Sequence, residues 1–314
     1  MSISAEVVRQ LREETGAGMM DCKSALVEAQ GDMAQARDLL RKKGLAAAAK
    51  KASRTAADGA VGSCILDGGK AGAIVEVNCE TDFVAKTPDF QSLVKDIAEH
   101  VAKNAPADVL ALAEQPFAGT PGQTVGQLVQ EKIAFIKENI VVRRFARFER
   151  PAGTKGLVAA YIHPPAANVG VLVELAAESA DEATLAGLAK DVAMHVAAAS
   201  PAAALYVSKD EVPADVLEKE KEIYRAQAAA SGKPANVVDK IAEGKVREYY
   251  GTFCLLEQPY SREPKTTVGQ HLKGKATPVR VVRITGALDD AAGAAVPPAA
   301  PFAGRGSELA ALAG

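Results

Sequence analysis

The sequence is poor in the residue types that most catalytic sites require. Aromatic residues make up 4% of its 314 residues, and tryptophan is missing. The four cysteines show neither a CxxC pair nor the spacing of a zinc site: Cys22, Cys64, Cys79 and Cys254. They fit buried free thiols in a reducing compartment. None of the four histidines lies in an HExxH motif, so we expect no metal site and no cofactor: His100, His163, His195 and His271.

Long apolar runs and a strong excess of one charge are also missing. No run approaches the ~18 apolar residues of a membrane span, and the N-terminal segment has acidic residues but no apolar core of a signal peptide. The net charge of -2 argues against a wholly basic nucleic-acid-binding surface. We therefore expect a soluble, cytosolic protein without membrane contact, and its length suggests two or more domains.

The first 44 residues predict a module of three short helices. Apolar residues recur there at helical spacing, and each helix is expected to end at a glycine, Gly16, Gly31 or Gly44, which adopts the positive φ of a C′ position. Residues 45–58 have no strong helical face and predict a linker, with a partly helical segment as the alternative. Its basic cluster could contact an acidic partner or RNA, although such clusters are more often simply solvated.

From residue 59 the apolar pattern changes to the alternation of strands. Two strands (60–66 and 71–77), helices after Thr87-Pro88 and at 125–137, and a strand at 140–148 are predicted. The same order returns with strands at 157–163 and 169–175, a helix at 182–198 and a strand at 279–285. Two stretches repeat in letters, DIAEHVA (96–102) as DVAMHVA (191–197) and TVGQ (124–127) as TVGQ (267–270). Together they indicate two related subdomains of the α+β class.

The second copy is interrupted by two amphipathic stretches that flank Ser231-Gly232-Lys233-Pro234, which predicts a helical hairpin directed into solvent. The last residues are dominated by Ala, Gly and Pro. The predicted organisation is a helical module at 1–44, a linker at 45–58, subdomain N at 59–150, subdomain C at 151–212 and 251–286, a hairpin at 213–250, and a disordered tail at 287–314.

The segment Glu80–Lys86 lies between a predicted buried strand and a well-capped helix, where most α+β domains have an exposed loop. One interpretation makes Asp82 a helix cap and Phe83 a core anchor, and spacing alone favours it. The other makes Phe83 a protruding wedge and Asp82 a hydrogen-bonding group that enter a partner's cleft.

Three further features leave alternatives open. The segment TGAGMM (15–20) lacks the Lys-Ser/Thr of a phosphate loop and is better explained as a turn. Met19 and Met20 are adjacent, so either one is exposed towards a partner or both are partly buried. His163, at a strand end beside Pro164-Pro165, is the histidine most suited to a surface contact, although a lone turn histidine is more often only solvated.

The opening VVRQLREETGAGMMDCKSALVEAQGDMAQARDLLRKKG, the stretch VEVNCETDFVAKTPDFQ, and the segments DVAMHVAAASP, EKEKEIYRAQAAASGKP and TVGQ are similar, in this order, to the bacterial elongation factor Ts family. The resemblance covers about residues 2–286. It implies a ubiquitin-associated-like N-terminal module and two core subdomains. It also implies a coiled-coil arm at 213–250, used for partner contact or self-association, and a cytoplasmic translation elongation factor.

The resemblance further implies guanine-nucleotide exchange on elongation factor Tu, with no covalent chemistry, no cofactor and no need for nucleic acid. Thr81, Asp82, Phe83 and Val84 would disturb the partner's Mg²⁺ and phosphate binding. The N-terminal contact would use Leu11, Arg12, Met19 and Met20, and His163 would reach the partner's far domain. Two departures are Pro164-Pro165, stiffer than the family's usual turn, and the Ala/Pro tail in place of a C-terminal helix.

Two other functions remain open from the residues themselves. A ubiquitin-associated-like adaptor would bind RNA or the ribosome through Lys42–Arg54, and this binding would be sensitive to salt. An enzyme of the α+β class would need a concave site with converging titratable groups.

Overall fold

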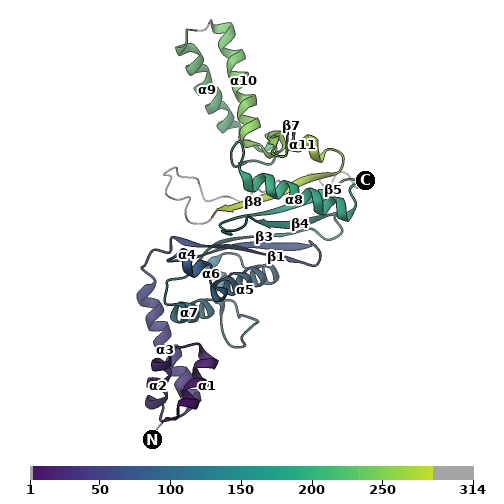
Figure 1. The fold of residues 1–314 in the computed structure, drawn as a ribbon. Helices are drawn as coiled ribbons and strands as arrows, with labels where there is room; N and C mark the ends of the chain where they lie inside the picture. Colours follow the sequence, from purple (N-terminus) through teal and green to yellow (C-terminus); the bar gives the residue numbers. More distant parts are fainter. Residues whose placement is uncertain (1–2, 233, 286–314) are drawn as a thin grey trace. The chain divides into compact units, whose positions relative to one another are not determined.

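The computed structural model describes residues 3–232 and 234–285 (Figure 1). It combines helices and strands, as the α+β prediction requires. The described residues form two compact units, one from residues 3–62 and 75–145 and the other from residues 63–74 and 146–284. Within the described part of the chain, no helix is both long and apolar enough to cross a lipid bilayer. The predicted tail at 287–314 lies outside the described residues.

Three helices form the N-terminal module: α1 (Ala5–Thr15), α2 (Met19–Glu28) and α3 (Met33–Lys51). Ser4 caps α1 by accepting a hydrogen bond from the Val7 amide, and Gly16 ends it with φ 65°. Asp32 caps α3 by accepting a hydrogen bond from the Gln35 amide at 2.9 Å. The small core of the module is made by buried residues of all three helices: Val8, Leu11, Cys22, Ala25, Leu26, Ala29 and Ala36.

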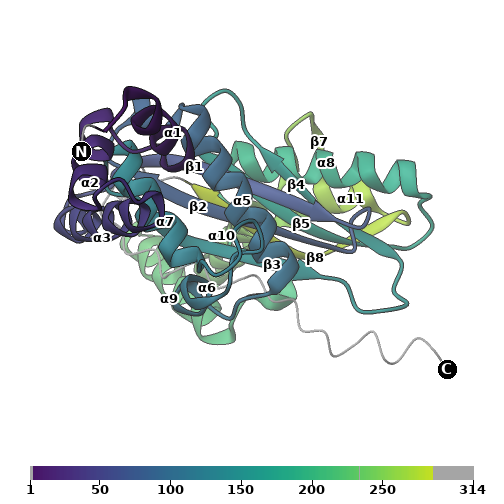
Figure 2. The same cartoon turned by 90° about the horizontal axis from the view of Figure 1, so that it is seen from below.

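The prediction that the third helix ends at Gly44 is wrong. Helix α3 continues through Gly44 to Lys51, over much of the expected linker. The reason is the alanine-rich sequence after Gly44, because alanine has the highest helix propensity and outweighs one interior glycine. Gly44 also lets α3 approach α7 (Val125–Ile136), since a Cβ at this position would lie 3.0 Å from that of Ala134. Helices α3 and α7 lie side by side (Figure 2), and Arg41 donates to Gln127 Oε1 of α7 at 2.9 Å.

The first copy of the repeated pattern contains the strands β1 (Asp58–Leu66), β2 (Ala71–Cys79) and β3 (Val141–Glu149), in the sheet order β1-β2-β3. Between β2 and β3 come α4 (Asp82–Ala85), α5 (Pro88–Asn104), α6 (Val109–Glu114) and α7. Thr87 caps α5 and Pro88 occupies its first turn, as predicted. Helix α5 buries an apolar side that includes Phe90, Leu93 and Ile97.

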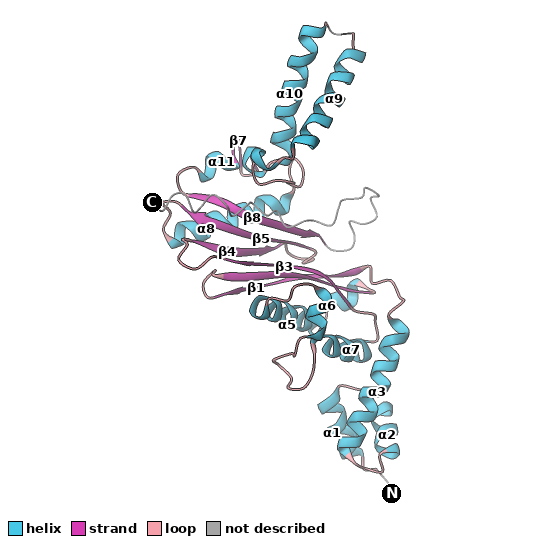
Figure 3. Ribbon diagram, turned by 180° about the vertical axis from the view of Figure 1, so that it is seen from behind, coloured by secondary structure: helices cyan, strands magenta, loops and turns pink. Residues whose placement is uncertain are grey.

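The second copy contains β4 (Gly156–Ile162), β5 (Val169–Ala177) and β8 (Ala276–Thr285), in the order β4-β5-β8 (Figure 3). Strands β4 and β5 are antiparallel with Ala159 opposite Val173, and α8 (Glu182–Ala198) packs on both. The predicted hairpin is confirmed as α9 (Ala214–Ala230) beside α10 (Ala235–Phe253). The remaining elements are short: η1 (Lys209–Glu211), η2 (Leu255–Glu257), β6 (Pro259–Tyr260), β7 (Glu263–Thr267) and α11 (Val268–Leu272).

The two copies share buried polar contacts as well as their order of elements. His100 Nε2 and Gln115 Oε1 are 2.9 Å apart in the first copy, and His195 Nε2 and Gln258 Oε1 are 2.9 Å apart in the second. Both histidines are buried, so these contacts belong to the interior of each copy. Both TVGQ segments form a capping box at the start of a helix, α7 or α11.

Candidate functional site

The strand-to-helix junction of the first copy forms a compact turn, here called the α4 turn (residues 80–87). Strand β2 ends at Cys79, and Thr81 caps the single helical turn α4 by accepting a hydrogen bond from the Val84 amide at 3.4 Å. Thr87 then caps α5, and its hydroxyl donates to the Val84 carbonyl at 2.8 Å. Two threonine caps six positions apart therefore bracket α4, a helical turn where the sequence predicted only an exposed loop.

The α4 turn presents an aromatic side chain to solvent. Phe83 is 79% exposed, so the interpretation of Phe83 as a core anchor is wrong. Asp82 is also exposed, and its Oδ2 accepts a hydrogen bond from Lys86 Nζ at 2.6 Å. Thr81, not Asp82, caps the turn, so the helix-cap interpretation of Asp82 is wrong as well. Val84 is half-buried, and Ala85 anchors the turn as its buried residue.

A residue that the sequence did not single out holds this turn from below. The Glu138 carboxylate, between α7 and β3, accepts hydrogen bonds from the backbone of residues 80 and 81 and from the Thr81 hydroxyl. The two segments are 57 positions apart at Thr81, so no local pattern could reveal the contact. The only sequence signal is a carboxylate placed directly between a helix end and a strand.

The N-terminal module exposes most of the residues expected in a partner contact. Arg12 on α1 is exposed, and Met19 and Met20 at the start of α2 are 44% and 70% exposed. The expectation of a direct contact through Leu11 is wrong, because its side chain is fully buried in the core of the module. Leu11 instead supports the surface on which the other three residues lie.

His163 follows β4 and is exposed, with its ring nitrogen Nδ1 3.0 Å from the Tyr161 hydroxyl. The backbone amide of His163 donates to the Val169 carbonyl at 2.8 Å, which keeps the histidine at the base of the β4–β5 connection. Because Nδ1 makes the contact with the Tyr161 hydroxyl, Nε2 is the other ring nitrogen through which the imidazole could bond a partner. The three groups of predicted site residues thus come from three different parts of the fold.

The thiols are unsuited to nucleophilic chemistry. Burial raises the pKa of Cys79 to about 12, with the nearby Glu138 carboxylate adding to the shift. Burial likewise raises the pKa of Cys254 to about 12, and burial also raises the pKa of Cys22. A thiol attacks as its thiolate, so these three groups are inert at neutral pH.

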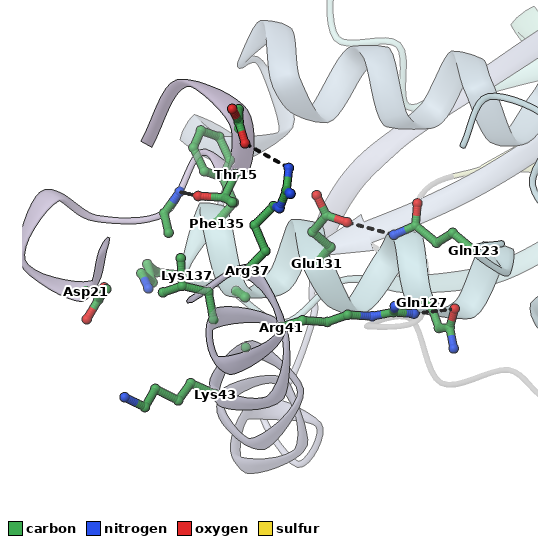
Figure 4. Close-up of a pocket in the computed structure, with 15 residues that line it drawn as sticks. Thr15, Asp21, Arg37, Arg41, Lys43, Gln123, Gln127, Glu131, Phe135 and Lys137 are labelled. Atoms are coloured by element: carbon green, nitrogen blue, oxygen red, sulfur yellow. Dashed lines mark hydrogen bonds and ion pairs between the residues drawn. The ribbon is translucent and has the colours of Figure 1, made fainter. Parts of the chain in front are cut away.

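A cavity of about 340 Å³ lies between the N-terminal module and α7 (Figure 4). Several of its charged side chains form hydrogen bonds with neighbours: Arg37 with Glu14 at 3.0 Å, Arg41 with Gln127 at 2.9 Å, and Glu131 with Gln123 at 2.7 Å. Phe135 narrows it at Gly16, where a Cβ would lie 2.9 Å from the ring. The Arg41–Gln127 bond joins the module to α7, whereas the other two pairs lie within the module or beside α7 itself. The three pairs do not converge on a point where a substrate could react.

Comparison with known proteins settles the family. The model of the family described as Elongation factor TS matches residues 80–286. Elongation factor Ts of Trichlorobacter lovleyi is 49% identical over 279 residues, covering 88% of both chains. The chain belongs to the elongation factor Ts family. The elongation factor Ts proteins of Syntrophotalea carbinolica and Methylococcus capsulatus are each 48% identical to it. Each alignment covers 90% of this chain and 92% of the relative.

Membership of the elongation factor Ts family confirms the resemblance seen in the sequence and makes the chain a translation elongation factor. The family is the nucleotide exchange factor of elongation factor Tu, so the adaptor function is not favoured. The match begins at Glu80, the first residue of the α4 turn, and therefore includes the whole of that turn.

Proposed function

We propose that this protein promotes GDP release from elongation factor Tu, and that the α4 turn carries out the step that loosens the nucleotide. One observation supports this most strongly: Phe83 is 79% exposed on a turn whose backbone is fixed by caps at both ends. Aromatic side chains are enriched at protein interfaces, and a few well-buried residues there supply most of the binding energy.

The chemistry of the partner explains how such a turn could act. A GTPase holds Mg²⁺ between nucleotide phosphates and protein oxygens in near-octahedral geometry, which tolerates little displacement. Insertion of Phe83, with Asp82 in contact beside it, would move the groups that hold the ion and the phosphates. By linkage, a factor that binds the nucleotide-free partner more tightly than the GDP form lowers GDP affinity by the same ratio.

The other exposed site residues would bind the partner at separate places. Arg12, Met19 and Met20 would form the contact of the N-terminal module, and His163 the contact of the second copy. Methionines suit such surfaces because their flexible thioether side chains adapt to a partner. The α9–α10 hairpin would serve a partner contact or self-association. In this account the protein makes and breaks no covalent bond, requires no cofactor, and works in the cytoplasm with elongation factor Tu.

The proposal is tested by the release of fluorescent GDP from elongation factor Tu in stopped flow. Saturating wild-type protein should accelerate release, and Phe83→Ala should lower the maximal rate at least about 30-fold, the equivalent of a 2 kcal/mol interface residue. Unfolding free energy should change by less than about 0.5 kcal/mol, because the side chain is exposed.

The chain offers a matched control in Leu110, which is also 79% exposed and lies on α6. Leu110→Ala removes a comparable exposed apolar side chain and should leave the release rate unchanged. Equal losses of release rate in both variants would show that nonspecific apolar contact, and not the α4 turn, accelerates release. No acceleration by the wild-type protein would overturn the proposed function.

A further inference from the structure

The α4 turn is hydrogen-bonded to Glu138, a residue in the connection between α7 and β3. Helix α7 ends at Ile136, and Lys137 follows with φ 71° in the left-handed region, which turns the chain sharply before β3. Glu138 is the next residue and is half-buried. Its position is therefore set by a helix end on one side and by the strand on the other.

Both oxygens of the Glu138 carboxylate accept hydrogen bonds from the α4 turn. Oε2 accepts from the backbone amides of Glu80 and Thr81, each at 3.0 Å, and Oε1 accepts from the Thr81 hydroxyl at 2.7 Å. An ionised acceptor makes each of these bonds stronger than a neutral pair would be. The Thr81 hydroxyl donates to Glu138 and accepts from Val84, so it links the carboxylate directly to the cap of α4.

The same two segments are also joined in the opposite direction. The Glu80 side chain accepts from the Asn139 backbone amide at 2.7 Å and pairs with Arg54 at 3.4 Å. The buried Asn139 side chain donates to the Arg54 carbonyl at 2.7 Å. Each segment thus offers a glutamate to the backbone of the other, which fixes the base of the turn in position and orientation.

We infer that Glu138 is a positioning residue for nucleotide exchange: it holds the α4 turn so that Phe83 is presented in the orientation that enters the partner. The inference rests on the proposed function. Phe83 is the fourth residue beyond β2, and its own side chain is almost free of intramolecular contact. Its direction is therefore determined by the turn backbone, and the strongest tertiary bonds on that backbone come from Glu138.

The variants are graded by what they remove. Glu138→Gln keeps the shape but loses the charge and replaces one acceptor by a donor, so one of the bonds to the turn is weakened or lost. Glu138→Ala removes all three bonds. The control is Glu99→Gln on α5, which makes the same chemical change at a half-exposed glutamate that pairs with Lys103 at 2.5 Å.

The first experiment is amide hydrogen exchange of the free protein, which does not depend on exchange activity. Residues 80–86 should exchange about tenfold faster in Glu138→Gln and faster still in Glu138→Ala, while α5 and the Glu99→Gln control remain as in the wild type. Unchanged protection at 80–86 would overturn the positioning role, whatever the protein does to GDP release. Loss of protection throughout the unit would show a merely structural role and would also overturn it.

The second experiment is a double-mutant cycle on GDP release from elongation factor Tu. Glu138→Ala should lower the maximal rate of GDP release about tenfold and leave the half-saturating concentration within about twofold of the wild type. The reason is that the residues proposed to bind the partner lie on the N-terminal module and in the second copy. In the Phe83→Ala background the same change should have little further effect, because Glu138 acts through Phe83. Additive losses would contradict the inference. Failure of the wild type to accelerate release would defeat the proposed function, while hydrogen exchange would still decide the positioning of the turn.

Discussion

The two copies of the repeated pattern share a framework and differ at one junction. In the first copy the junction between strand and helix contains the α4 turn, with its exposed aromatic. In the second copy β5 ends at Ala177 and Asp181 already caps α8. The amides of Glu178, Ser179 and Ala180 all donate to the Lys275 carbonyl. The second junction therefore closes on its own subdomain, while the first presents a side chain outward.

The shared framework extends to buried charges. Glu76 in β2 pairs with Arg144 in β3 at 2.6 Å, and Glu174 in β5 pairs with Arg280 in β8, with Nε and Oε2 2.5 Å apart. Both glutamates are buried. Removing one partner of such an ion pair lowers the stability of the fold, because it leaves a buried charge without its counter-charge. The comparison teaches that the repeated interior sets the framework, whereas the connections between elements carry what is particular to each copy.

The largest effect should come from breaking the buried ion pair. Arg144→Ala would remove the arginine paired with the fully buried Glu76 carboxylate, which also accepts from the Asn78 amide at 3.2 Å. Unfolding should become easier by about 3 kcal/mol, and Arg280→Ala should cost a similar amount in the second copy. Urea denaturation measures both. A clear cost in one copy and none in the other would break the comparison.

A smaller, unequal effect is expected at the two glutamines that bond the buried histidines. Gln258 also donates to the carbonyls of Ala202 and Thr252 at 3.0 and 2.6 Å, which ties both ends of the α9–α10 insertion to the subdomain. Gln258→Ala should cost about 2–3 kcal/mol, and Gln115→Ala about 1 kcal/mol. Thermal unfolding of the two variants checks the order. A larger cost for Gln115→Ala would mean that the insertion does not depend on this bond.

The smallest effect is a pH dependence that belongs to the second copy. Burial lowers the pKa of His195, despite its hydrogen bond to Gln258. Below the unfolded pKa of about 6.5, the unfolded chain binds a proton that the folded chain does not bind. The contribution of His195 to the free energy of unfolding is therefore complete above this pH and is lost as the pH falls below it. The slope should be at most about 1.4 kcal/mol per pH unit. Denaturation between pH 7 and 5 should show this loss, and His195→Asn should reduce it. An unchanged slope in the variant would exclude His195 as the source.

The sequence predicted those elements whose signals are local. Thr87 and the proline after it defined the start of α5, because capping depends on residues three positions apart. The end of the third helix also depends on local residues. The alanines after Gly44 favour the helix more than this one glycine opposes it, so a glycine alone does not predict the helix end. The fold class and the order of the repeats followed from such local patterns.

The site could be predicted only in part. The motif at 81–84 pointed to the right turn, but spacing alone favoured a buried Phe83. The helical form of the turn and its support depend on Glu138, which is distant in the sequence. Leu11 was misassigned because an apolar residue in a motif can serve either the core or the surface, and periodicity does not separate the two.

The central claim is that Phe83 acts on the partner's Mg²⁺ and phosphates. The most direct measurement is GDP release from elongation factor Tu at saturating protein, with wild type and Phe83→Ala compared in Mg²⁺ and in EDTA. The account predicts a deficit of at least about 30-fold for the variant in Mg²⁺ and a much smaller deficit once the ion has been removed. Equal rates for the two proteins in Mg²⁺, or an undiminished deficit in EDTA, would contradict it.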